Sequence, residues 1–285
     1  MRKVDRSSVG LPPRLAEDLS DAIEQVRRGQ DARPDIYRHR DVVIRLRQLY
    51  LGKCYLCERT LDDEGIVEHF IPWHPKYPER AYDWCNLHWS CFDCNQRKKG
   101  APYRIPTRAN QAAERTDLID PSDLLPGEAI SDLLTFDPLS AKATALRTND
   151  LVVANTELFL NDLKPLHLRC VRRAELADTI VQADCKGIWE TICLSTDIDI
   201  SSWSTNERAQ WLSAIQKADG IYERFLREGA PFGVSMRIAI HRMVGLTADE
   251  FRRMSDAYRN HRSLSLVRDI FGAAPSSATV CTPSG

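Results

Sequence analysis

Two Cys-x-x-Cys pairs constrain the fold of this chain more than any other feature of its sequence. They are Cys54/Cys57 and Cys91/Cys94, and 33 residues separate them. Zinc binds four thiolates tetrahedrally, and a two-residue gap lets both sulfurs of a pair point into one tight turn. The metal would close a loop long enough to hold a hairpin and would supply much of the folding free energy of a small subdomain. We therefore expect these four cysteines to form a structural zinc site.

The chain has nine cysteines, and the alternative to a zinc site is a set of reduced core thiols. Two pairs with this spacing rarely arise by accident, which favours zinc. Cys85 stands alone, so we expect a core thiol there rather than a ligand. The cysteines without paired spacing are expected to be inert: Cys170, Cys185, Cys193 and Cys281. This use of cysteine fits a reducing compartment, so we expect a cytoplasmic protein.

Composition excludes several classes of protein. A hydrophobic content of 43% over 285 residues is enough for a core, in one large domain or two small ones. No apolar run approaches the roughly 18 residues of a membrane span. The net charge of −1 argues against a protein that coats nucleic acid by electrostatics alone. Residues 1–115 hold 21 basic against 17 acidic side chains (+4) and the rest 18 against 23 (−5), so we expect nucleic-acid contact in the first part.

Hydrophobic spacing predicts mostly helices outside the region of the cysteine pairs. One helix is expected between Pro13 and Gly29, and a second over residues 35–50. Prolines interrupt residues 101–155, which we interpret as an extended connection with a hairpin formed by 133–136 and 143–146. Capping boxes, in which a Ser or Thr precedes a Glu by three residues, predict two later helix starts, at Ser204/Glu207 and Thr247/Glu250.

The residues between and beside the two cysteine pairs carry the chemistry. Glu68 and His69 end a short predicted strand, and Asn86 and Asn95 follow later in the same region. Hydrolysis of a phosphodiester needs a base to activate water and a cation to neutralise charge on the phosphate. A neutral imidazole suits the first role near pH 7. Carboxylate and amide oxygens are ligands that Mg²⁺ prefers.

Residues 54–100 resemble the HNH endonucleases of the ββα-metal class, in the subgroup with a four-cysteine zinc site. That family pairs an acidic residue with a histidine, then has a central Asn and, nine residues later, a His or Asn in a C-x-x-C-N-x-x-K segment. The resemblance implies that His69 is the general base and that Asn86 holds the loop that orients it. It also implies that Glu68 and Asn95 bind a catalytic cation, Mg²⁺ or another divalent ion. Aspartate is commoner than glutamate at the position of Glu68.

The resemblance extends to flanking segments: the opening MRKV, DLIDP at 117–121 and TELFLNDLKPLHLR at 156–169. These resemble the PtuB family, the HNH effector subunits of Septu-type anti-phage systems, some of which are linked to retrons. The resemblance implies a PtuA-like ATPase as partner, which forms the scaffold of the assembly. It further implies nucleic acid as substrate, with DNA preferred to RNA. Because the chain has no long apolar run, we expect no membrane partner.

The predicted fold class is α+β and mostly helical, with a small ββα-metal, treble-clef-like HNH core and its structural zinc embedded in a helical protein. The expected divisions are N-terminal helices (1–50), the HNH core (51–115), an extended connector (116–155), a helical region for partner docking (156–271) and a disordered tail (272–285). Two other functions stay open. One is a zinc module that binds nucleic acid or protein without cutting, and the other is a nuclease that acts alone, as restriction-type HNH enzymes do.

Several neighbours of the predicted site have competing interpretations. His74 and His88 are alternatives to His69 as the base, and we expect both to be structural or solvated. Trp89 and Tyr103 are expected to fill the core around the zinc rather than stack on bases. A basic patch beside Asn95 either contacts phosphate or forms a solvated helix face. It consists of Arg97, Lys98, Lys99 and Arg104.

Overall fold

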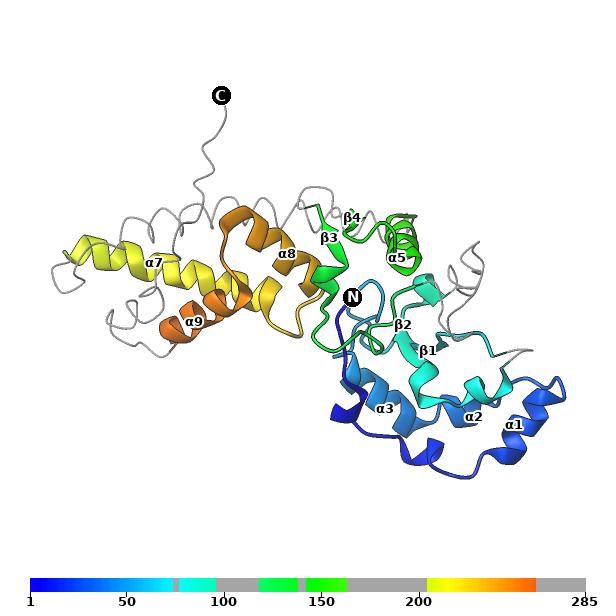
Figure 1. Cartoon of the computed structure of the whole chain (residues 1–285). Coiled ribbons are helices and arrows are strands. Elements are labelled where there is room, and N and C mark those ends of the chain that lie inside the picture. Colours follow the sequence, from blue (N-terminus) through cyan, green and yellow to red (C-terminus); the bar gives the residue numbers. More distant parts are fainter. Residues whose placement is uncertain (74–76, 96–117, 138–141, 163–203, 260–285) are drawn as a thin grey trace. The chain divides into compact units, whose positions relative to one another are not determined.

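The computed structural model describes residues 1–73, 77–95, 118–137, 142–162 and 204–259 (Figure 1). The fold is mostly helical α+β with two small antiparallel sheets, as the sequence predicts. Two compact units make up the chain: Met1–Leu176 with Glu228–Ala239, and Ala177–Arg227 with Ile240–Gly285. The division falls within helix α8 (Gly233–Val244). Within the described ranges, every helix is too short or too polar to cross a membrane.

The N-terminal part of the first unit consists of short helices. These are η1 (Arg6–Ser8), η2 (Pro13–Leu15), α1 (Ser20–Arg27), α2 (Pro34–Tyr37) and α3 (Arg40–Leu49). The single helix expected over 35–50 is broken, because the backbone is extended at His39 (φ −55°, ψ 148°). The carboxylate of Asp41 accepts a hydrogen bond from the backbone N of Arg14 at 2.7 Å. A contact with a distant segment thus fixes the start of α3, which helical periodicity alone does not reveal.

An antiparallel hairpin lies at the centre of the first unit. Strand β1 (Ile66–His69) pairs with β2 (Leu87–Ser90), so that Glu68 lies opposite His88 and His69 opposite Leu87. The connection holds the short helices η3 (Pro78–Ala81) and η4 (Trp84–Asn86). Residues 92–95 are helical, directly after the second strand. The order of two strands and a helix start agrees with the predicted ββα arrangement.

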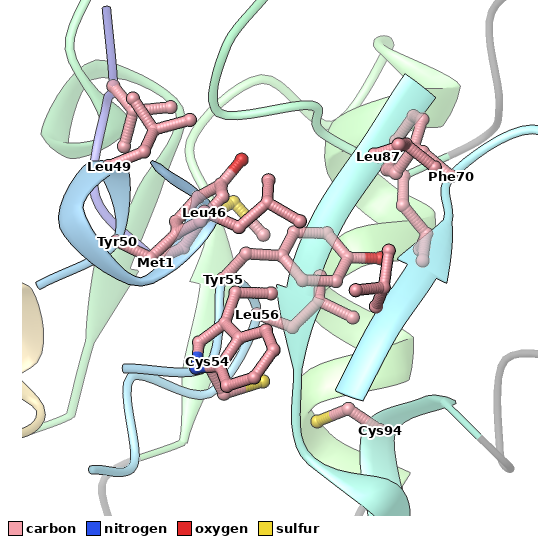
Figure 2. Close-up of a cluster of buried hydrophobic side chains, with 14 of the residues drawn as sticks. Met1, Leu46, Leu49, Tyr50, Cys54, Tyr55, Leu56, Phe70, Leu87 and Cys94 are labelled. Carbon is pink, nitrogen blue, oxygen red and sulfur yellow. The ribbon is translucent and has the colours of Figure 1, made fainter. Parts of the chain in front are cut away.

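One hydrophobic core joins the β1–β2 hairpin, the turn that carries Cys54 and Cys57 (the cysteine loop) and helix α3. Helix α3 packs against β2, and the buried side chains come from all three elements. Figure 2 shows Leu46 and Leu49 from α3 together with Tyr55 and Leu56 from the cysteine loop and Leu87 from β2. Burying these side chains removes apolar surface from water at roughly 25 cal/mol per Å². The cysteine loop is therefore part of the core that positions the hairpin.

The described residues between 118 and 162 contain more helix and strand than the extended connection that the sequence predicts. It contains η5 (Ile130–Asp132), β3 (Leu134–Phe136), β4 (Ala143–Ala145) and α5 (Leu151–Asp162). The strands β3 and β4 pair antiparallel, which confirms the expected hairpin. The side chain of Asn161 binds both the backbone N and the carbonyl of Ala143, each at 2.9 Å. Helix α5 is thereby fixed to the edge of this hairpin.

The second unit is helical in its described part. Helix α7 (Thr205–Ile221) continues into a π-helical segment, η7 (Tyr222–Leu226), and packs against α9 (Ala248–Arg259). Both predicted capping boxes are present at the helix starts. Asp219 of α7 accepts hydrogen bonds from Ser255 at 2.6 Å and from Arg259 at 2.8 Å. These bonds fix α9 against α7.

Candidate active site

The two cysteine pairs meet in the first unit and form one cluster. The sulfur atoms of Cys54, Cys57, Cys91 and Cys94 all lie within 4.8 Å of one another, and all four residues are buried. Cys57 Sγ lies 3.9 Å from Cys91 Sγ. Tetrahedral zinc with bonds of about 2.3 Å spaces its sulfur ligands by about 3.8 Å, so the cluster has the right size. The four cysteines support a structural zinc site.

Local backbone geometry turns the first pair towards the second. The backbone N of Glu58 binds the carbonyl of Cys54 at 2.9 Å, and Glu58 has a positive φ of 57° that closes the turn. The backbone N of Tyr55 binds the carbonyl of Trp89 at 2.9 Å. The first cysteine turn is therefore attached directly to strand β2, next to the second pair.

His69, the predicted base, is half-buried at the end of β1. Its Nε2 lies 2.9 Å from the carbonyl oxygen of Ala81. Because a carbonyl can only accept, Nε2 carries the proton, and in the neutral ring Nδ1 holds the lone pair. The ring also makes an edge contact with Tyr37, with centroids 4.7 Å apart. These contacts fix the orientation of the imidazole and select the tautomer.

Asn86 fixes the loop that follows β1. Its Oδ1 accepts a hydrogen bond from the backbone N of Ile71 at 2.6 Å. Its Nδ2 donates to the carbonyls of Ile71 (3.0 Å) and Arg80 (2.8 Å). The side chain is buried, so these three bonds replace lost contacts with water. One amide thus joins the two ends of the loop between His69 and η3.

Glu68 and Asn95, the predicted cation ligands, are both buried, with exposures of 1% and 2%. The Oδ1 atom of Asn95 has no hydrogen-bond partner in the described part of the chain. A buried acceptor without a partner costs about 1–3 kcal/mol. An amide oxygen and a carboxylate are the kinds of ligand that a hard divalent cation prefers. The two residues therefore fit such a cation by their chemistry.

His88, an alternative base, is fully buried. Its Nε2 lies 3.2 Å from Nη2 of Arg6, and its Nδ1 lies 2.7 Å from the hydroxyl of Tyr50. The guanidinium of Arg6 can only donate, so Nε2 accepts and Nδ1 carries the proton. Burial raises the pKa of the neighbouring Asp120, whose Oδ2 lies 3.6 Å from Nε2. His88 therefore belongs to a buried structural network, one of the two expected outcomes.

Arg6, for which no sequence pattern predicts a role, contacts the same region. It also donates to the carbonyls of Trp84 at 2.6 Å and Leu87 at 3.0 Å. It therefore holds η4 and the start of β2 from the far N-terminal segment. Its guanidinium lies over the ring of Trp84, 5.1 Å from the centroid. Only its position in space distinguishes this arginine from the others, so no local pattern in the sequence could have singled it out.

Two further predictions near the site have different outcomes. Trp89 is 3% exposed and fills the core, as expected. Cys85 is exposed, so the expectation of a core thiol is wrong. Its backbone N binds the side chain of Asp83 at the start of η4, and this short helix turns the thiol outwards. The remaining candidates lie outside the described residues: His74, Arg97, Lys98, Lys99, Tyr103, Arg104, Cys170, Cys185, Cys193 and Cys281.

The hairpin, the four-thiol cluster and the helix start that carries Asn95 lie in one continuous stretch of sequence. Residues 54–100 match the family model of the HNH endonucleases. The search of curated proteins and the search of solved structures each found no match. The HNH match suggests a nuclease that binds nucleic acid, and it covers both cysteine pairs and the four predicted site residues.

Proposed function

We propose that this protein is a metal-dependent HNH endonuclease that hydrolyses phosphodiester bonds of nucleic acid, with DNA preferred to RNA. The observation that carries this proposal is the hydrogen bond from Nε2 of His69 to the carbonyl of Ala81. A histidine held in this tautomer, at the end of the strand that also carries Glu68, is prepared to act as a base. The HNH match over 54–100 supports the same assignment.

In this mechanism His69 accepts a proton from a water molecule at Nδ1, and the water attacks phosphorus in line with the leaving oxygen. Glu68 and Asn95 would hold a divalent cation, with Mg²⁺ favoured by their oxygen ligands. Such a cation would supply positive charge against the negative charge that develops in the reaction. Asn86 keeps the loop after β1 closed, which maintains the acceptor for Nε2 of His69. The zinc site stabilises the fold and takes no part in the reaction.

The substitution His69→Ala tests the mechanism. We expect the variant to retain zinc and the fold while cleavage of plasmid DNA with Mg²⁺ is lost. His39→Ala is the matched control, because His39 is an exposed histidine of the same unit, paired with Asp41. Unchanged cleavage by a folded, zinc-loaded His69→Ala variant would show that the proposed base is wrong. Absence of cleavage by the folded, zinc-loaded parent would instead favour a zinc module that binds nucleic acid or protein without cutting.

We further propose that the chain is the nuclease subunit of an anti-phage complex with a PtuA-like ATPase. The support is the resemblance of residues 1–4, 117–121 and 156–169 to the PtuB family, and the helical region from 156 is the proposed docking region. Co-expression with such an ATPase, followed by gel filtration, tests the proposal. Co-elution of the two chains is expected. Separate elution, with cleavage by this chain alone, would instead indicate a nuclease that acts by itself.

A further inference from the structure

Tyr55 lies between Cys54 and Cys57 of the proposed zinc site. Its hydroxyl is a buried polar group with no role in the mechanism proposed above. The residue is 1% exposed. Its hydroxyl has no hydrogen-bond partner among the residues that the structure describes. Leaving such a donor unsatisfied costs about 1–3 kcal/mol, so each buried case calls for an explanation. The residues around the ring indicate a role for the hydroxyl.

The ring of Tyr55 lies on the face of the hairpin that carries Glu68. Its centroid is 4.6 Å from that of His88 and 6.1 Å from that of Phe70. His88 is the cross-strand partner of Glu68. Phe70 follows Glu68 by two positions, and its backbone N donates a hydrogen bond to the carbonyl of Asn86. Residues directly opposite and two positions apart share one face of a sheet. Figure 2 shows the Tyr55 ring reaching from its loop towards the strands.

Tyr55 and the two proposed cation ligands are all buried, Glu68 with 1% and Asn95 with 2% exposure. Cys54, directly before Tyr55, and Cys94, directly before Asn95, belong to the same four-thiol cluster. The unpartnered Oδ1 of Asn95 is a second buried polar atom in this region.

We propose that Tyr55 is a positioning residue for the cation site, whose hydroxyl donates a hydrogen bond to the Glu68 carboxylate when that carboxylate holds the cation. This inference rests on the proposed function. A ligating carboxylate needs outer partners that fix its orientation, and loss of one typically weakens metal binding about 10- to 100-fold. Because Tyr55 lies within the turn of Cys54 and Cys57, the structural zinc site also sets the geometry of the cation site.

The substitution Tyr55→Phe removes only the hydroxyl and tests the proposal. Mn²⁺ serves as the probe, with the free ion measured by electron paramagnetic resonance on zinc-loaded protein. We expect Tyr55→Phe to bind Mn²⁺ about 10-fold more weakly than the parent. Tyr50→Phe is the matched control, since it loses an equally buried hydroxyl that is bonded to His88 at 2.7 Å. This control should bind Mn²⁺ as the parent does.

Thermal melting without added Mn²⁺ separates positioning from a structural role. Tyr55→Phe should melt no lower than the parent, because it loses a hydroxyl that has no partner there, whereas Tyr50→Phe should melt lower. Addition of Mn²⁺ should raise the melting temperature of Tyr55→Phe less than that of the parent. A lower melting temperature of Tyr55→Phe without Mn²⁺, or parent-like affinity for the ion, would overturn the proposal.

Asn95→Ala distinguishes failure of this inference from failure of the proposed function. Weaker Mn²⁺ binding by Asn95→Ala, together with parent-like binding by Tyr55→Phe, would reject the role of Tyr55 and leave the cation site intact. Absence of Mn²⁺ binding to the parent protein would reject the cation site and the role of Tyr55 together. Weaker binding by both variants would support both proposals.

Discussion

Asn86 and His69 bind neighbouring carbonyl groups of one short helix. Nδ2 of Asn86 donates to the carbonyl of Arg80 at 2.8 Å, and Nε2 of His69 donates to the carbonyl of Ala81 at 2.9 Å. The position of the carbonyl that selects the tautomer of His69 thus depends on the amide of Asn86. This relationship gives a physical reason for an asparagine 17 residues after the histidine.

Asn86→Asp should damage both stability and cleavage. Aspartate keeps an acceptor for the backbone N of Ile71 but loses both donors, so the free energy of unfolding should fall by about 1–3 kcal/mol. Displacement of the carbonyl that orients His69 should lower the cleavage rate by about 100-fold. Urea denaturation and single-turnover cleavage measure the two effects. Asn161→Asp is the control, because it also loses a donor to a backbone carbonyl, that of Ala143, and should reduce stability without the loss of cleavage.

Removal of one zinc ligand should unfold the core around the hairpin. Cys91→Ser leaves three thiolates, so zinc content measured by mass spectrometry should fall and the near-ultraviolet circular dichroism of the buried tryptophans should weaken. Cys85→Ser is the matched control, since Cys85 is exposed and outside the cluster. It should retain the parent's zinc. Full zinc occupancy in Cys91→Ser with the parent's affinity would contradict the four-thiolate site.

Gly65 precedes β1 at a point of close approach to Trp89. A Cβ at this position would lie 2.0 Å from Cε2 and Cζ2 of the indole. The indole is packed in the core, so Gly65→Ala should lower the free energy of unfolding by about 1–3 kcal/mol through overpacking. Gly220 in α7 has nothing within 4 Å of a Cβ, and Gly220→Ala should stabilise its helix by about 0.5–1 kcal/mol. Denaturant titration of both variants tests these opposite signs.

The buried carboxylate of Asp120 should make stability depend on pH. Burial raises the pKa of Asp120 in the folded state above its ordinary value of 3.8. The folded protein then holds the proton to higher pH than the unfolded chain, so stability falls as pH rises from about 3.8 through the folded pKa. Asp120→Asn keeps an acceptor for the backbone N of Ser122 and removes the titration. As pH rises through this range, the unfolding free energy of the variant should increase relative to that of the parent. Parallel curves of unfolding free energy against pH for the two proteins would contradict the assignment.

The strand over 66–69 and the clustering of the four cysteines could be predicted from the sequence because each starts from a short-range pattern. The two-residue spacing in each cysteine pair requires only one turn. The alternation in residues 66–69, ended by Pro72, requires only the geometry of one strand. The capping boxes at Ser204 and Thr247 are similarly local and are present in the structure. In each case the residues that form the pattern lie within a few positions of one another.

Predictions failed where distant segments meet. The helix expected over 35–50 is interrupted at His39, next to an aspartate that binds the backbone of Arg14. Cys85 is exposed because a short helix forms around it. The residues around His39 and Cys85 form no sequence pattern that predicts these contacts. The competition between helical propensity and a tertiary hydrogen bond is decided only when the chain is folded.

The sequence by itself determined that four cysteines would form one cluster and which residues between them offer oxygen and nitrogen atoms to a site. Only the tertiary structure decided that Nε2 of His69 is protonated, because that depends on the carbonyl of Ala81. It also brought the ring of Tyr55 onto the face of Glu68 and placed Arg6 against His88, 82 positions away. Spacing along the chain fixes which groups are neighbours within a turn or a strand. Hydrogen-bond direction and burial depend on which surfaces the core brings together.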